Sequence, residues 1–428
     1  MKEKEHNSFE ICPTGKCTAC GACVNICPMK AISFKENEYG ELHPFVDLNK
    51  CTGCGLCQKR CPNNNPNKFN QAGHCFAAWI LDNEKRAECA SGGVATMLSE
   101  YVVTEKKGVV FGTAYDANMI PRVTWVDALE GVEKLKGSKY VKSVVGADTF
   151  KKVLEFLDED RYVLFIGTPC QISGLLSFLG GERENLLTVD LLCHGVCPVN
   201  YFISEIEYLK ARYKIENVSN IRFRGNDEDN SLMTFFDRLI GRYNSNNYKL
   251  SVWTKDRFGK PLLRYRGGPA ENYYLAGFMK GISLRENCYS CSYARPERIS
   301  DLTIGDFIGL GQEIPFEGPL INTSVVLTNS RKGEVLYSDV VEKKGGVVSM
   351  ERPFSERLSY PFSLTKPFPH HILAPRFRKL YRKIGYRSAI VKVLWVVLLK
   401  ERIFGLLAHF SRLPGYAVDK IMKKIKNA

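Results

Sequence analysis

The chain has no long hydrophobic run, and this absence limits where the protein can act. Its first residues, 1–6, are mostly charged and no apolar stretch follows them, so a secretory signal peptide is not expected. In the C-terminal region, the apolar run 393–399 is far shorter than the roughly twenty residues that span a bilayer. The sequence therefore predicts a cytoplasmic protein, and a reducing compartment with metal ligation explains its sixteen cysteines better than disulfides do.

Signatures of nucleic-acid binding are also absent, although the net charge is +14. Residues 371–428 hold fourteen Lys or Arg and two acidic residues, a net charge of +12, so the preceding 370 residues are nearly neutral. Without a helix-turn-helix, zinc-finger or RNA-binding motif, we expect no nucleic-acid partner. The basic tail is predicted to be helical. It either lies on the anionic inner face of a membrane with Trp395 buried, or packs as a helical element whose basic face docks an acidic partner.

Eight cysteines near the start form two copies of one pattern. The copies are Cys17-x-x-Cys20-x-x-Cys23-x-x-x-Cys27-Pro28 and Cys51-x-x-Cys54-x-x-Cys57-x-x-x-Cys61-Pro62. This is the run of bacterial ferredoxins, in which three close thiolates hold one [4Fe–4S] cluster and the fourth reaches across to the other. We therefore assign Cys17, Cys20, Cys23 and Cys61 to one cluster and Cys51, Cys54, Cys57 and Cys27 to the other. Zinc sites and disulfides are the alternatives, but zinc favours CxxC pairs with a longer spacer.

The texture of the sequence changes after this module. Residues 1–66 are predicted to be a duplicated dicluster ferredoxin-like module, ended by the turn-rich stretch 62–67. From about residue 75, strand and helix patterns alternate, which predicts a mixed α/β body and an overall class of α+β or α/β. Residues 200–285 fit no simple pattern. The expected strands are 31–34, 76–80, 109–115, 161–166, 186–192, 301–306 and 323–328, and the expected helices are 94–103, 149–157, a segment ending at 179, and one from 331.

Four further cysteines stand where strands end or loops turn. Cys170 begins a helix, where the helix N-terminus favours a thiolate, and Cys193 ends the next strand. Cys288 and Cys291 form a CxxC pair. Together these four residues would supply the ligands of a third [4Fe–4S] cluster, with Cys197 competing for the place of Cys193. A zinc knuckle, or a CxxC redox pair with two unrelated buried thiols, stays open from spacing alone.

Two short segments have the composition of a cofactor cradle. Ser91-Gly92-Gly93 precedes a helix, and glycine there lets an anionic ligand approach the helix N-terminus. Residues 137–143 offer hydroxyl groups and a cation close together. An ordinary turn and an exposed loop are the alternative interpretations.

Taken as a set, these motifs resemble the coenzyme F420 hydrogenase/dehydrogenase beta subunit family, which includes formate dehydrogenase beta subunits and a plant hydroxymethyl-chlorophyll reductase. The resemblance covers about residues 75–330, and fusion to an N-terminal dicluster ferredoxin is common in this family. Residues 284–291 and the basic tail look closer to bacterial members associated with surface-polysaccharide gene sets. The motifs that carry the resemblance, in the order of the family, are Ser91-Gly92-Gly93, 137–141, 167–171, Cys193-His194-Gly195, Cys288-x-x-Cys291 and 304–307.

The resemblance implies an FAD beside the third [4Fe–4S] cluster, and hydride exchange with a deazaflavin such as coenzyme F420 or another two-electron partner. It divides the body into the N-terminal region 72–150 and the C-terminal region 151–345 of the family, followed by the tail 371–428. His194, the histidine inside a motif, is predicted to donate a proton near the flavin, with a structural role as the alternative. The implied flavin neighbours are Ser91, Gly92, Gly93, Ser138, Tyr140, Val141 and Thr168.

Two functions follow from these expectations. The first is an FAD- and iron–sulfur-dependent oxidoreductase, because a flavin accepts a hydride as an electron pair and passes the electrons on singly. The second is a non-catalytic electron-transfer subunit or adaptor. The cradle-like segments favour the first, since a relay needs no cradle. A redox partner protein, or a deazaflavin- or nicotinamide-type donor, is expected, and the absence of a CxxxCxxC run argues against a radical enzyme that uses S-adenosylmethionine.

Overall fold

The computed structural model describes residues 9–13, 15–224 and 248–410, and the chain forms two compact units. Unit 1 consists of Met1–Phe202 and Leu284–His370, and unit 2 of Ile203–Ser283 and His371–Ala428. Unit 1 contains the cysteine-rich N-terminal module and the largest sheet, so the predicted metal ligands all belong to it.

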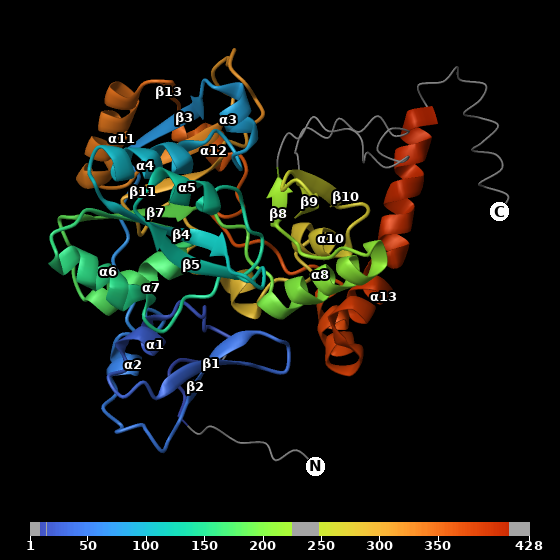
Figure 1. Cartoon of the computed structure of the whole chain (residues 1–428), viewed down its shortest axis with the longest axis horizontal. Coiled ribbons are helices and arrows are strands. Elements are labelled where there is room, and N and C mark those ends of the chain that lie inside the picture. Colours follow the sequence, from blue (N-terminus) through green and yellow to red (C-terminus); the bar gives the residue numbers. More distant parts are fainter. Residues whose placement is uncertain (1–8, 14, 225–247, 411–428) are drawn as a thin grey trace. The chain divides into compact units, whose positions relative to one another are not determined.

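The centre of unit 1 is an eight-stranded mixed sheet (Figure 1) with the order β13-β3-β12-β11-β7-β6-β4-β5. The neighbours β11, β7, β6 and β4 run parallel, and the remaining pairs are antiparallel. Every residue of β12 is buried, as expected of an apolar run covered on both faces. The strands are β3 (His74–Ile80), β4 (Val109–Tyr115), β5 (Pro121–Val126), β6 (Val163–Gly167), β7 (Leu186–Leu191), β11 (Leu302–Asp306), β12 (Ser324–Thr328) and β13 (Val347–Glu351).

Helices cover both faces of this sheet, which confirms the predicted mixed α/β body (Figure 1). On one face, α4 (Val94–Thr104), α5 (Leu129–Leu135) and α11 (Arg331–Lys344) pack their apolar side chains against the strands. On the other, α6 (Thr149–Asp158) and α7 (Pro169–Leu179) bury aromatic and aliphatic residues at helical spacing. The chain from β6 through α7 to the parallel β7 is the predicted βαβ unit. Two shorter helices are α3 (Asn83–Ala87) and α12 (Phe354–Leu358).

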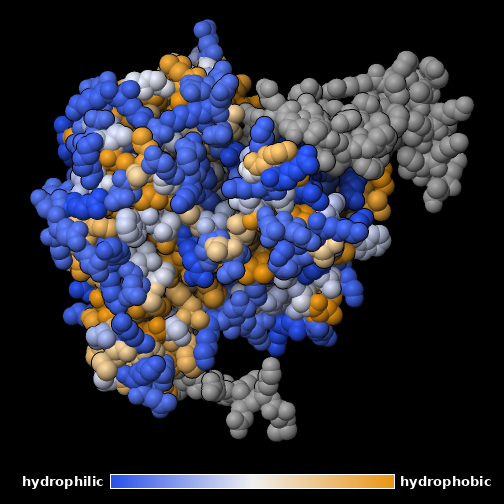
Figure 2. Space-filling model, in the orientation of Figure 1, coloured by the Kyte–Doolittle hydropathy of each residue, from blue (hydrophilic) through white to orange (hydrophobic). Residues whose placement is uncertain are grey.

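The N-terminal module is a small fold of its own on the side of α6 and α7. It contains α1 (Ala22–Ile26), the antiparallel hairpin β1 (Ile32–Glu36) and β2 (Leu42–Val46), and α2 (Leu56–Lys59). Its core consists of cysteines and a few aliphatic residues, and hydrophobic residues also show on its surface (Figure 2). Asn25 joins it to the body, since its side chain donates to the carbonyl of Gly146 and accepts from the backbone N–H of Phe150.

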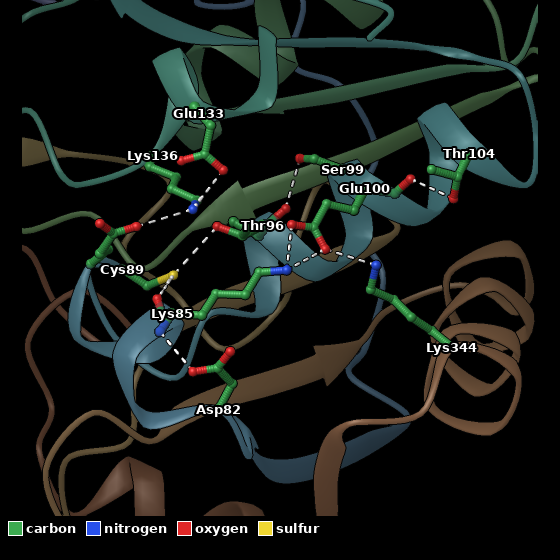
Figure 3. A network of polar contacts seen from close by, with 12 residues as sticks. Asp82, Lys85, Cys89, Thr96, Ser99, Glu100, Thr104, Glu133, Lys136 and Lys344 are labelled. Carbon is green, nitrogen blue, oxygen red and sulfur yellow. Dashed lines mark hydrogen bonds and ion pairs between the residues drawn. The ribbon is translucent and has the colours of Figure 1, made fainter. Parts of the chain in front are cut away.

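In the body of unit 1, a polar network fastens α3 and α11 to α4 (Figure 3). The carboxylate of Glu100, on α4, accepts from Lys85 at 2.6 Å and from Lys344 at 2.7 Å. Burial raises the pKa of Glu100, but the hydrogen bonds from the two lysines lower it more, so that its pKa lies below the ordinary value. The charged form of Glu100 therefore holds three helices together.

Unit 2 has a three-stranded antiparallel sheet and helices. The sheet order is β10 (Pro261–Gly267), β9 (Tyr248–Lys255), β8 (Asn220–Arg224), and the helices are α8 (Val199–Tyr213, in unit 2 from Ile203 on), α10 (Tyr273–Met279) and α13 (Ala374–Phe410). The predicted helical tail is α13, interrupted at Gly385 with a φ of 72°. Residues Ile390, Leu394 and Leu398 are buried, so one face of α13 is a packing element. The rest of the predicted tail, 411–428, lies outside the described residues.

Candidate functional site

The four cysteines predicted to share a cluster line one cavity of unit 1. Cys170 lies in the first turn of α7, whose N-terminus is fixed by a capping box between Thr168 and Gln171. Cys193 follows β7, and Cys288 and Cys291 come from the short helix η2 (Glu286–Ser290) and the residue after it. The space between its walls measures about 550 Å³, which includes solvent at the open side. Its other lining residues are Thr18, Thr168, Pro169, His194, Gly195, Val196, Asn287, Tyr293, Ala294, Ser363, Pro367 and Phe368.

Glycine at position 195 allows the loop after β7 to approach η2. Gly195 has a φ of 119°, in the region that favours glycine. A Cβ there would stand 2.8 Å from the side chain of Leu284 and 3.3 Å from the Cβ of Cys288. The Cys193-His194-Gly195 motif thus brings Cys193 close to the CxxC pair.

The four thiols also act on one another electrostatically. Burial raises the pKa of Cys193 well above its ordinary value, and the charges of Cys288, Cys170 and Cys291 raise it further. Burial raises the pKa of Cys288 to about 11 and that of Cys291 to about 12, with a further contribution from Cys170. A coordinated metal would supply the positive charge that such thiolates need.

The spacing of ligands differs between a single ion and a cluster. Among the described residues, no group of three or more His, Cys, Asp or Glu side chains is arranged to hold one metal ion. A zinc ion draws its thiolates to about 2.3 Å from one centre. A [4Fe–4S] cluster instead takes one thiolate on each of its irons.

Two buried cations act on a thiol of the cavity. Arg285 is 1% exposed and Lys142 is 3% exposed, and both charges lower the pKa of Cys288, against the larger effect of burial. Within the described part of the chain, neither Arg285 Nη1 nor Lys142 Nζ has a hydrogen-bond partner, and the same holds for Thr18 Oγ1 in the cavity wall. Because an uncompensated buried charge is costly, these residues fit an anionic group such as a thiolate-ligated cluster.

The cysteines of the N-terminal module fall into two groups. Burial raises the pKa of Cys20 to about 12, and the charges of Cys17 and Cys61 contribute to this rise. Burial also raises the pKa of Cys57, with contributions from Cys27 and Cys51. Cys61 thus acts on cysteines of the first run and Cys27 on a cysteine of the second, and Cys57 also acts on Cys23. The individual ligand roles stay predictions.

One cysteine outside both runs lies in the first group. The thiol of Cys12 contacts Cys17 and Cys61, and these contacts, with burial, raise its pKa. Asn63 donates to the sulfur atoms of both Cys61 and Cys12, at 3.9 and 4.0 Å. Sequence reasoning passed over Cys12 because it stands outside the repeated spacing.

The first group of the module is a direct neighbour of the cavity. Gly174 lies on α7, one turn beyond Cys170, and a Cβ on it would stand 2.8 Å from the Cβ and 3.0 Å from the Sγ of Cys20. The charge of Cys170 contributes to the raised pKa of Cys20. Thr18, the residue after Cys17, lies in the cavity wall. The two cysteine sets therefore meet across α7.

The predicted flavin neighbours fall in different places. Thr168 lines the cavity, with its hydroxyl 3.2 Å from the sulfur of Cys170. The Ser91-Gly92-Gly93 segment is instead bonded to the start of β12, since Ser91 donates to the carbonyl of Thr323 and the backbone N–H of Gly92 donates to the hydroxyl of Ser324. A Cβ on Gly92 would clash with the carbonyl oxygen of Ala78, so the packing of protein segments alone requires glycine there. Gly92 therefore has a packing role in this structure, and the flavin contact of this segment stays a prediction.

Residues 138–143 lie outside the lining of the cavity. Ser138 and Tyr140 are half-buried, and Val141 is 1% exposed. The next residue, Lys142, donates its backbone N–H to the carbonyl of Cys197. The side chain of Cys197 is fully buried and outside the cavity lining, whereas Cys193 lies in it.

His194 lies in the cavity wall beside the cysteines, and its role as a proton donor stays a prediction. Its ring stands with its centroid 3.9 Å from that of Phe368. Phe368, Pro367 and Ser363 come from a segment that no motif marks, so sequence reasoning missed them. Thr18 and Asn287 were missed too, although their positions beside Cys17 and Cys288 could have pointed to them.

Two regions of the chain match known protein families. Residues 160–352 match the family model for the C terminus of the coenzyme F420 hydrogenase/dehydrogenase beta subunit, and residues 16–65 match that of a 4Fe-4S dicluster domain. A solved chain from the F420-reducing [NiFe] hydrogenase complex of Methanosarcina barkeri aligns at 14% identity with a TM-score of 0.41, over 77% of this chain and 92% of that one. No curated protein sequence matches.

Proposed function

Because this chain is a relative of the coenzyme F420 hydrogenase/dehydrogenase beta subunits that carries an N-terminal 4Fe-4S dicluster domain, we propose that it is an iron–sulfur flavoprotein oxidoreductase. Cys170, Cys193, Cys288 and Cys291 hold a third [4Fe–4S] cluster, and electrons pass between it and FAD-linked hydride chemistry. One observation carries the proposal. Cysteines from three distant segments line a single cavity whose wall also includes Thr18 of the dicluster module.

The three clusters form a path through unit 1. The first module cluster, on the group that contains Cys20, is next to the third cluster across Gly174. The second, on the group that contains Cys57, ends the path near the surface, because Cys54 is exposed. Met29 and Leu48, close in sequence to Cys27 and Cys51, are 47% and 55% exposed. This end of the module is the exit toward a redox partner protein.

The flavin part of the proposal is supported by the family relation and by the wall of the cavity. FAD, when bound, would accept a hydride as an electron pair and release single electrons. Thr168 and His194 line the cavity beside the cysteines, so they are the residues best placed to orient the flavin and to hold a proton near it. The other predicted flavin contacts remain Ser91, Gly92, Gly93, Ser138, Tyr140 and Val141. A deazaflavin such as F420, or a nicotinamide, is the two-electron partner.

The competing function is an electron-transfer subunit or adaptor that holds no flavin. Such a subunit would supply electrons for surface-polysaccharide biosynthesis. Flavin analysis of the anaerobically purified full chain distinguishes the two. We expect about one flavin per chain and reduction of the clusters by one of three donors, namely reduced F420, reduced ferredoxin or NAD(P)H. Full iron content with no flavin would contradict the proposed oxidoreductase and would favour the relay subunit.

We also propose that α13 brings the protein to an anionic membrane surface. Trp395, Leu399 and Ile403 recur at helical spacing, and all three are more than one-third exposed. Lys392 and Lys400 flank this apolar stripe. Among the described residues, no helix is both long enough and apolar enough to cross a bilayer. The stripe with its basic flanks is typical of a helix that lies in the interface.

A further inference from the structure

Arg285 lies between the first module cluster site and the cavity of the third. Its backbone N–H donates to the carbonyl of Val196, in the loop that follows Cys193. Its guanidinium Nη2 donates to the backbone carbonyls of Cys17, at 3.2 Å, and Leu42, at 3.1 Å. Both of these residues belong to the N-terminal module. Arg285 therefore joins the module to the wall of the cavity.

The same side chain also reaches the CxxC pair. Arg285 Nε donates to the side-chain oxygen of Asn287 at 3.2 Å, and the Asn287 amide nitrogen lies 3.9 Å from the sulfur of Cys288. The guanidinium thus has one hydrogen bond to the backbone of the predicted ligand Cys17. It has another to Asn287, whose amide donates to the predicted ligand Cys288.

Among the described residues, no ion pair neutralises the charge of Arg285. Its three hydrogen-bond acceptors are neutral oxygens, and in the described residues no carboxylate oxygen lies within 4 Å of its guanidinium. By contrast, the equally buried Arg298 pairs with Asp190 at 2.8 Å. A cation that is 1% exposed and lacks a counter-ion needs an anionic neighbour to be stable.

We propose that Arg285 is a shared positioning cation, which raises the reduction potentials of the first module cluster and of the third cluster together. This inference rests on the proposed function, because it needs the third cluster. Reduction adds an electron to each cluster, and a fixed positive charge in a low-dielectric interior stabilises the more negative state. A single charge that acts on both clusters shifts their potentials in the same direction, so it favours reduction of both while changing the driving force between them little.

Lys142 supplies a matched comparison. Its ammonium is also buried and without a hydrogen-bond partner in the described residues, and it acts on Cys288. No contact between Lys142 and the N-terminal module is recorded in this part of the chain. Removal of its charge should change one cluster, whereas removal of the charge of Arg285 should change two.

The test is a potentiometric titration of the anaerobic full-length protein, followed by electron paramagnetic resonance. In Arg285→Gln, two of the three midpoint potentials should become more negative. Each should fall by at least 59 mV, which is a tenfold change in the reduction equilibrium constant for one electron. In Lys142→Met only one should fall. Arg285→Gln with full iron and unchanged potentials, or with a single shifted potential, would overturn the proposal.

A charge-conserving variant keeps the test decisive if Arg285→Gln fails to fold or to retain iron. Arg285→Lys keeps the charge and loses the forked hydrogen bonds, so both potentials should stay well within a tenfold change. A tenfold fall of both in this variant would show that geometry, not charge, sets them. If the wild type holds only two clusters, the proposed function fails and the shared role of Arg285 fails with it, whereas three clusters with unchanged potentials in Arg285→Gln overturn the role of Arg285 alone.

Discussion

At the scale of single residues, the cavity distinguishes two cysteines that the sequence leaves as rivals. Cys193 lies in the cavity wall, and Cys197, four residues later, is fully buried outside it. Cys193→Ser should therefore remove about four of about twelve irons per chain, because one missing thiolate opens the cluster. Cys197→Ser should keep the full count. Iron analysis after anaerobic purification checks this, and iron loss from the Cys197 variant instead would reverse the assignment.

How far the site was predictable depends on how local each signal is. The cysteine runs are local repeats, so the two groups of the N-terminal module follow from spacing. Phe368 reaches the cavity only through the path of the folded chain, and nothing in its neighbourhood of the sequence marks it. The glycines at 92 and 93 show a related difficulty, because packing against β3 demands glycine as strictly as a ligand would, so the pattern alone does not separate the two reasons.

At the scale of elements, strong patterns located the strands and helices well. The expected strand 109–115 is β4, and the expected helix 149–157 is α6 to within one residue, because an apolar run and a helical period are properties of the sequence itself. The sheet of unit 2 escaped because its strands mix cations with aromatic rings. Arg222 lies over the ring of Trp253 and Arg224 over that of Tyr248, and although the short β8 alternates buried and half-buried residues, β9 and β10 do not.

The contact between α7 and the dicluster module can be tested at Gly174. Gly174→Ala places a methyl group about 3 Å from the side chain of Cys20, so the module must shift away from α7. We expect a loss of about 1–3 kcal/mol in the free energy of unfolding and slower electron transfer between the clusters. A Cβ on Gly181, near the end of the same helix, meets nothing within 4 Å, so Gly181→Ala is the control. Equal effects of the two substitutions would contradict this contact.

The ion pairs of Glu100 allow a second prediction, about the contacts between α3, α4 and α11. Glu100→Gln should lower the free energy of unfolding by about 1–3 kcal/mol at neutral pH, because it weakens the contacts that join α3 and α11 to α4. The exposed pair Lys152–Glu155 provides the control Glu155→Gln, with an expected loss below about 1 kcal/mol. Guanidinium denaturation followed by circular dichroism measures both.

The effect of Glu100 should also depend on pH in one direction. Its pKa is lowered in the folded protein, so its stabilisation is complete above the unfolded pKa of about 4.3 and is lost as the pH falls through the lower folded value. The difference between wild type and Glu100→Gln should therefore narrow below about pH 4. A difference that stays constant down to pH 3 would contradict the charged network.

At the scale of the whole molecule, the excess positive charge belongs to unit 2. By sequence, unit 2 holds 28 basic and 11 acidic residues, a net charge of +17, and unit 1 has a net charge of −3. Unit 2 also presents the apolar stripe of α13.

We expect the full chain to float with vesicles that contain anionic lipid and much less with neutral vesicles. Trp395→Ser with Leu399→Ser should reduce flotation, and Leu48→Ser is the control for loss of an exposed apolar residue elsewhere. Equal flotation with both kinds of vesicle would contradict an electrostatic contact.

The central claim is that unit 1 carries three clusters, two in the N-terminal module and one in the cavity that joins the module to the body. The most direct measurement is the iron and acid-labile sulfide content of the anaerobically purified full chain. We predict about twelve irons per chain, four of them lost when Cys288 and Cys291 are both replaced by serine. About eight irons in the wild type, unchanged by that double substitution, would contradict the account.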